Sequence, residues 1–152
     1  MSVLSRKRSV SELEFYKNGK EIRAELTRYL MSEKHIPKRY TFIFTIPGVR
    51  LARKMMQYIT AANTIYPKNE DDLRQRWNYQ TKAIIKCEQM MQHIQWMIDT
   101  LDTVKPSDFI KSDESQNDKL AEKIIKEVSL LKAWRGKNKI MQQSSGENPK
   151  RD

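Results

Sequence analysis

The chain has few of the residues that build turns and disulfides, and it has no long apolar run. Its 152 residues include 1 Cys, 4 Gly and 5 Pro. A lone cysteine excludes an intramolecular disulfide, and so few glycines and prolines favour long helices. The longest strongly apolar run, around 42–46, is too short to cross a bilayer. The basic residues before Ser9 are not followed by the apolar segment of a signal peptide. We therefore expect one helical domain, located in the cytoplasm, with no membrane partner.

A helical repeat dominates the middle of the chain. Core-compatible residues recur at steps of three and four, which predicts a helix of about eight turns with one buried stripe. The stripe consists of Leu73, Trp77, Gln80, Ile84, Cys87, Met91, Ile94, Ile98 and Leu101. A second row lies beside it, formed by Ala83, Met90 and Met97. The apolar face is therefore wider than a two-stranded coiled-coil seam and needs several partner helices.

Prolines and capping residues divide the rest of the chain. The expected helices span 10–31, 46–65, 69–102 and 118–136, with a polar loop at 107–118. Ser9 or Ser11 is expected to open the first helix, Thr45 the second and Asn69 the third. Gly136 is expected to end the last helix as a C-terminal cap. Four helices joined by short connections predict an all-α fold, an antiparallel four-helix bundle.

The bundle is expected to cover residues 10–137, between two tails. Residues 1–9 form a basic tail, and residues 138–152 form a polar tail that we expect to be disordered. The expected helix at 46–65 is apolar around most of its circumference, which a single bundle does not bury. This pattern predicts that part of the helix meets another subunit, and hence a homo-oligomer.

The sequence does not place the residue types that catalyse reactions or bind metals at the spacings these functions require. A di-iron bundle needs Glu three residues before His, but Ser32 precedes His35 and Met90 precedes His93 at that spacing. His93 is therefore expected at the surface or the core edge. Cys87 stands at a core position without a basic or His partner, which indicates a buried apolar residue rather than a nucleophile. We expect no catalytic residue, no metal and no cofactor.

Charge is the strongest functional signal. With 29 basic and 19 acidic residues the formal net charge is +10, which favours an anionic partner such as RNA, DNA or a membrane surface. The alternative is a solvated charged face that serves only solubility. The candidates for phosphate contacts lie in the first connection and the two middle helices: Lys38, Arg39, Arg50, Arg53, Lys54, Arg74, Arg76, Lys82 and Lys86.

Three segments, in their order and spacing, resemble a known family. They are 36–42 (Ile-Pro-Lys-Arg-Tyr-Thr-Phe), 61–67 (Ala-Ala-Asn-Thr-Ile-Tyr-Pro) and 127–134 (Glu-Val-Ser-Leu-Leu-Lys-Ala-Trp). With the acid-capped long helix, they resemble the accessory variability determinant proteins of diversity-generating retroelements, over about residues 12–137. The resemblance departs at 46–50, where only Gly48 and Arg50 correspond to the family's usual Gly-Gln-Arg turn.

The resemblance implies a basic four-helix bundle that assembles as a barrel-shaped homopentamer. Such proteins catalyse nothing themselves. They bind the retroelement's reverse transcriptase and nucleic acid, RNA and also cDNA, and support mutagenic cDNA synthesis.

Two other interpretations stay open. The related bundle proteins encoded in intervening sequences of ribosomal RNA genes share the architecture, so the chain fits a stand-alone structural or assembly protein without a polymerase partner. A helical enzyme or metal protein is a third possibility, which predicts metal in the purified protein.

Overall fold

The regular structure of the described residues is entirely helical. A computed structural model describes residues 13–104 and 113–141. The described chain holds four α-helices: α3 (Glu14–Met31), α4 (Ile46–Thr64), α5 (Glu70–Val104) and α6 (Asp113–Gly136). Two short helical turns, η1 (Lys38–Tyr40) and η2 (Thr41–Thr45), connect α3 to α4. The described residues contain no strand, so the predicted all-α class, a helical bundle, is confirmed.

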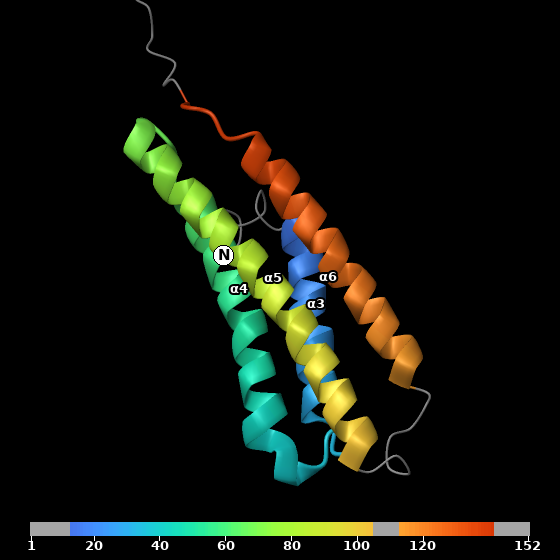
Figure 1. Cartoon of the computed structure of the whole chain (residues 1–152). Coiled ribbons are helices and arrows are strands. Elements are labelled where there is room, and N and C mark those ends of the chain that lie inside the picture. The colour runs from blue at the N-terminus through green and yellow to red at the C-terminus, as the bar shows by residue number, and fades with distance from the viewer. Residues whose placement is uncertain (1–12, 105–112, 142–152) are drawn as a thin grey trace, which may run out of the picture.

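Helix α3 lies along α6 (Figure 1). The ring of Phe15 stacks on that of Trp134 with a centroid distance of 4.1 Å. At the other end of α3, the amide of Asn117 lies 3.4 Å from the Tyr29 hydroxyl. Between these two contacts, residue numbers rise along α3 as they fall along α6.

Helix α4 packs along α5, and three contacts fix their register. The rings of Tyr58 and Tyr79 stack at 6.2 Å between centroids. Below them the Cys87 thiol lies 3.4 Å from the Met55 sulfur. At the foot of α4, His93 Nε2 lies 2.8 Å from the backbone oxygen of Phe44, which stands two residues before α4 begins. The contacts again follow the two helices in opposite order.

The buried line of α5 differs from the predicted stripe. Seven residues with three- and four-residue spacing are fully buried or nearly so: Gln80, Ala83, Cys87, Met90, Ile94, Met97 and Leu101. The predicted second row therefore belongs to the centre of the core. Trp77 was expected inside, but it is 47% exposed, and the Arg135 guanidinium lies 5.0 Å from its ring centre. Leu73, Met91 and Ile98 are half-buried on the same flank.

A polar pair is buried between α3 and α6. Asn18 Nδ2 donates hydrogen bonds to Glu127 Oε2 at 2.8 Å and to the backbone oxygen of Lys123 at 2.9 Å. Burial raises the pKa of Glu127 to about 8. Gly19 beside this pair lets α3 approach α4 closely, because a Cβ there would lie 2.8 Å from the Met56 sulfur of α4. The core therefore contains a carboxyl group that is uncharged at neutral pH.

One predicted helix cap is confirmed and another is wrong. Asn69 Oδ1 accepts a hydrogen bond from the Asp72 backbone N–H at 2.9 Å and so caps α5 as predicted. Thr45 does not cap α4. Its hydroxyl donates instead to the Leu30 backbone oxygen at 2.9 Å, because the preceding turn already continues the helical backbone into α4. Ser9 and Ser11 lie outside the described residues.

The remaining helix ends differ by a few residues from those predicted. Helix α3 begins at Glu14, since Leu13 has an extended backbone. The loop predicted at 107–118 is wrong from Asp113 onward, where α6 already begins. Polar composition did not prevent helix formation there, because Asn117 is buried against α3. Helix α6 ends at Gly136 as expected, but without a positive φ angle.

Candidate nucleic-acid interface

Helix α4 presents its basic residues to solvent. Arg50, Arg53 and Lys54 are exposed, whereas Met55 on the opposite side of the helix is fully buried. Among the described residues, none of the three cations takes part in an ion pair. Residues 34–69 contain no Asp or Glu, so no carboxylate of this segment neutralises them. Their charge is available to an external anion.

Helix α5 adds two cations beside α4. Lys82 is exposed, and its ammonium group lies 5.7 Å from the ring centre of Tyr58 and 5.5 Å from that of Tyr79. Lys86, one turn further along, is half-buried and donates a hydrogen bond to Gln89 Oε1 at 2.7 Å. The contact with Tyr58 of α4 places Lys82 on the same side of the molecule as the α4 cations.

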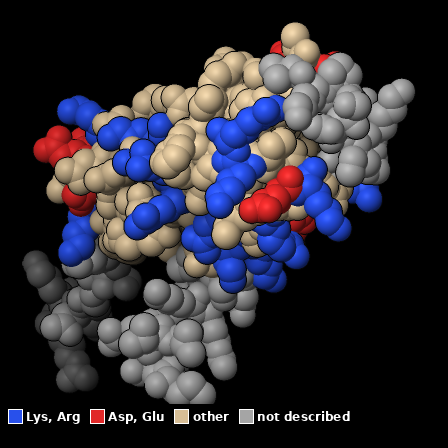
Figure 2. Space-filling model, turned by 90° about the horizontal axis from the view of Figure 1, so that it is seen from below, with Lys and Arg blue, Asp and Glu red and all other residues tan. Residues whose placement is uncertain are grey.

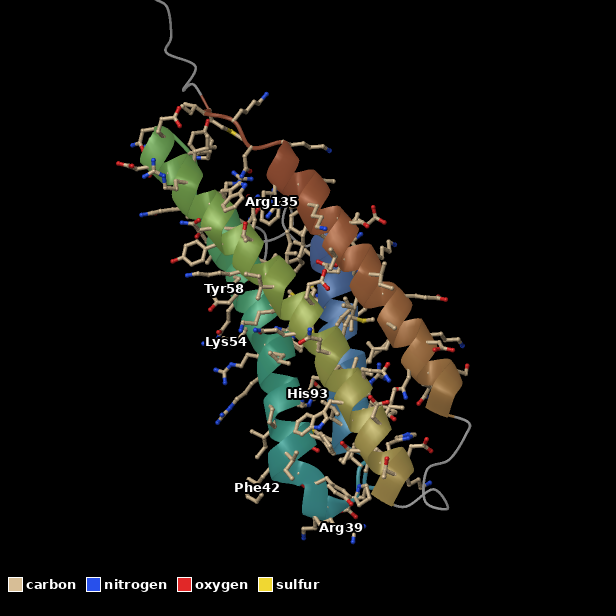
Figure 3. The ribbon with its side chains drawn as sticks, viewed as in Figure 1. Arg39, Phe42, Lys54, Tyr58, His93 and Arg135 are labelled. Atoms are coloured by element: carbon tan, nitrogen blue, oxygen red, sulfur yellow. The ribbon has the colours of Figure 1, made fainter. Side chains whose placement is uncertain are left out.

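Five of the nine predicted residues thus form one surface, which we call the basic face: Arg50, Arg53, Lys54, Lys82 and Lys86. Figure 3 shows Lys54 and Tyr58 on the outer flank of α4. Lys38 and Arg39 lie on η1, below the foot of α4, and both are exposed. Figure 2, which views the molecule from that end, shows Lys and Arg side chains spread over the surface with few Asp and Glu between them.

The other two predicted residues occupy different surroundings. Arg74 is exposed and lies 3.8 Å from Asp71, a weak surface ion pair. Arg76 is half-buried. It donates to the Ile65 backbone oxygen at 3.3 Å, and its guanidinium lies 5.4 Å from the Trp134 ring centre. Burial lowers the pKa of Arg76. Its contacts hold the α4–α5 connection against α6.

Aromatic side chains next to these cations were not predicted as site residues. Phe42 is 83% exposed on η2, directly after the basic residues of η1. Tyr58 and Tyr79 meet across the two helices beside Lys82. The sequence did contain a signal for Phe42, since it follows Lys38 and Arg39 closely. The pairing of Tyr58 with Tyr79 depends on the register of α4 against α5, which no local pattern specifies.

The side chains best suited to catalysis or metal binding, Cys87 and His93, are packed against other residues. Cys87 is fully buried, as predicted, and burial is the main cause that raises its pKa. Its thiol is therefore protonated and shielded. His93 is half-buried against the Phe44 carbonyl, which confirms its expected position at the core edge. In the described parts of the chain, no three His, Cys, Asp or Glu side chains are grouped as metal ligands.

A cavity of about 530 Å³ lies on the α3–α6 side, away from the basic face. Its lining mixes both signs of charge: Glu25, Arg28, Tyr29, Ser32, His35, Gln116, Lys119 and Leu120. The mixed charge distinguishes it from the uniformly basic α4–α5 surface.

Within the residues that the structure describes, no helix combines the length and apolar character that crossing a membrane requires. Comparisons of the chain with family models, with curated proteins and with solved structures find no match.

Proposed function

We propose that the protein is a non-catalytic, nucleic-acid-binding accessory protein. The observation that carries the proposal is the basic face, whose exposed arginines and lysines have no acidic partner among the described residues. Phosphate groups of RNA are the anions that such a surface suits, since neutralising them releases condensed counterions. The charge, rather than a cavity or a reactive group, therefore supports the assignment.

The mechanism follows from the donors present. Arg50 and Arg53 can each grip a phosphate with two parallel hydrogen bonds, whereas Lys54, Lys82 and Lys86 act as point charges. Phosphate contacts fix the position of a strand without reading its sequence. The protein would thus hold RNA for an enzyme that supplies the active site.

The partner assignment rests on the family resemblance. We propose an antiparallel four-helix bundle that assembles in the cytoplasm as a homo-oligomer, a pentamer by resemblance. It would bind a reverse transcriptase together with RNA and cDNA, and so support the mutagenic cDNA synthesis of a diversity-generating retroelement. Because six residues of α4 are already buried within one chain, the apolar circumference of that helix gives the oligomer less support than the sequence suggested.

The decisive experiment reverses the α4 charges. Arg50→Glu, Arg53→Glu and Lys54→Glu together should weaken binding of a structured RNA by at least about a hundredfold at low salt, and reduce the slope of log K against log salt by about two to three. Fluorescence anisotropy across a salt series measures both quantities. Circular dichroism should remain unchanged, because all three side chains are exposed.

A matched variant changes the same amount of charge elsewhere. Lys17→Glu, Arg23→Glu and Lys132→Glu alter exposed cations of α3 and α6 and should reduce RNA affinity much less. Equal losses in both triple variants would mean that only net charge matters, and unchanged binding in the α4 variant would reject the basic face as the RNA site.

A second experiment tests the partner. Co-expression with a reverse transcriptase encoded beside this chain should give a complex that co-elutes at a mass well above that of the oligomer alone. The oligomer itself should have a solution mass that is a multiple of 18.1 kDa. Absence of any neighbouring reverse transcriptase gene would favour the stand-alone bundle instead.

A further inference from the structure

Phe42 is unusually placed for an aromatic residue. It is 83% exposed, more than any other large apolar side chain of the described residues. Figure 3 shows it at the foot of α4, pointing away from the bundle, with Arg39 nearby on η1. Lys38 and Arg39 precede it on η1, and Arg50 follows it about two turns later. An aromatic ring is thus presented to solvent between cations.

The backbone around Phe42 is held on both sides. Phe44 is fully buried, and His93 contacts its carbonyl. Thr45 is tied to α3 by its hydrogen bond to the Leu30 backbone oxygen. Pro47 has no N–H, so η2 closes with the wider hydrogen bond from the Ile46 N–H to the Thr41 oxygen. The ring therefore projects from a fixed turn rather than from a free loop, which lowers the entropy lost when a ligand stacks on it.

A second aromatic position lies at the other end of the basic face. Tyr58 and Tyr79 are half-buried and stacked at 28° between ring planes, with Lys82 beside both rings. Phe42 precedes α4, and Tyr58 lies about 18 Å along that helix from its first residue, given a rise of about 1.5 Å per residue. Arg50 and Lys54 lie between them. Two cations therefore separate the two aromatic positions along this part of the chain.

We infer that the basic face binds single-stranded RNA, whose unpaired bases stack on Phe42 and on the Tyr58–Tyr79 pair while Arg50 and Lys54 hold the phosphates. The inference rests on the proposed function and narrows its ligand from RNA in general to single-stranded RNA. Bases within a duplex are stacked on their neighbours, so only unpaired bases offer a free face to an aromatic ring. The positive charge around the rings favours a polyanion over an apolar protein segment.

The test compares a single strand with a duplex. Fluorescence anisotropy measures binding of a labelled RNA of about 15 unpaired nucleotides and of a duplex of equal length. Phe42→Ala should weaken single-strand binding by about five- to a hundredfold and change duplex binding by less than about twofold. Phe42→Tyr, which keeps an aromatic ring, should retain most of the affinity.

A matched control variant completes the design. Ile125→Ala removes another exposed apolar side chain, 57% exposed on α6, and should not alter RNA binding. If the wild-type protein binds neither RNA form at low salt, the proposed function and this inference fail together.

Two further outcomes overturn the inference alone. Equal binding of strand and duplex, unaffected by Phe42→Ala, would leave a face that recognises only phosphates. A change of solution mass in Phe42→Ala, with RNA affinity unchanged, would assign Phe42 to a contact between subunits.

Discussion

The α3–α6 pair and the α4–α5 pair are built from similar amphipathic helices, yet they place charged groups differently. Between α3 and α6 the charges face one another: Lys123 binds Glu25 and lies 3.4 Å from Glu21, and Lys126 lies 3.0 Å from Glu14. Between α4 and α5 the contacts are sulfur on sulfur and ring on ring. There the cations remain outside, without carboxylates.

The difference follows from where the acidic residues stand in the chain. Helices α3 and α6 interleave both signs, so that Lys123 and Lys126 of α6 pair with carboxylates of α3. Residues 34–69 and 73–87 contain no acidic residue, and the five cations of the basic face form no ion pair among the described residues. Surface ion pairs add little to stability, typically below about 1 kcal/mol. The same residue types thus form ion pairs between one pair of helices and, on our proposal, remain available to an external anion on the other.

The largest expected effect concerns the buried polar contact between α3 and α6, whose contribution to stability depends on pH. The pKa of Glu127 is about 8 in the fold and about 4.3 in the unfolded chain, so between these values the folded state binds a proton that the unfolded state has released. Stability contributed at this position is therefore highest below about pH 4 and decreases as pH rises through 8. At about 1.4 kcal/mol per pKa unit, the loss across the window amounts to several kcal/mol.

Urea unfolding of the wild type and of Glu127→Gln, repeated from about pH 5 to about pH 9, measures the effect. The amide keeps the size of the side chain and an acceptor for Asn18 but does not titrate. Its stability should rise relative to the wild type as pH increases. Parallel stability curves for the two proteins would show that the Glu127 carboxyl titrates normally.

A smaller effect is expected from removing one partner of each buried contact. Asn18→Ala takes away the hydrogen bond to Glu127 and leaves a buried carboxyl without one, which should cost about 2 kcal/mol. Met55→Leu, in the apolar α4–α5 contact, conserves volume and should cost less than about 1.5 kcal/mol. Thermal and urea unfolding compare the two variants. Equal losses would mean that both helix pairs depend on packing alone.

The main elements of the fold could be predicted from local patterns. The long helix and its Asn69 cap follow from spacing and residue type, because both depend on neighbours within a few positions. Trp77 was misplaced because a helical stripe gives direction but not the depth at which the core ends. The start of α6 was missed for a related reason, since Asn117 is polar yet buried against Tyr29.

The residues of the candidate site likewise divide into those whose positions local patterns predict and those whose positions depend on tertiary contacts. Exposure of Arg50, Arg53 and Lys54 follows from the apolar character of the rest of α4, and the structure places them accordingly. Arg76 belongs to the same pattern in the sequence, but tertiary contacts to Ile65 and Trp134 enclose it. Its position depends on how α5 and α6 approach each other, which composition and spacing leave undetermined.

The smallest expected effect comes from comparing a lysine that forms an ion pair between helices with a lysine of the basic face. Lys123 is bonded to Glu25, and that hydrogen bond is the main cause that raises its pKa, whereas Lys54 has no partner among the described residues. Lys123→Met should lower stability by up to about 1 kcal/mol and leave RNA affinity unchanged. Lys54→Met should leave stability unchanged within about 0.5 kcal/mol and reduce the salt slope of RNA binding by about one. Urea unfolding and fluorescence anisotropy on both variants measure stability and RNA affinity. A loss of RNA affinity in both variants would contradict the idea that α3–α6 cations stabilise the fold while α4–α5 cations bind RNA. The comparison is a fair one because each change removes a single positive charge and keeps an unbranched side chain on a helix surface.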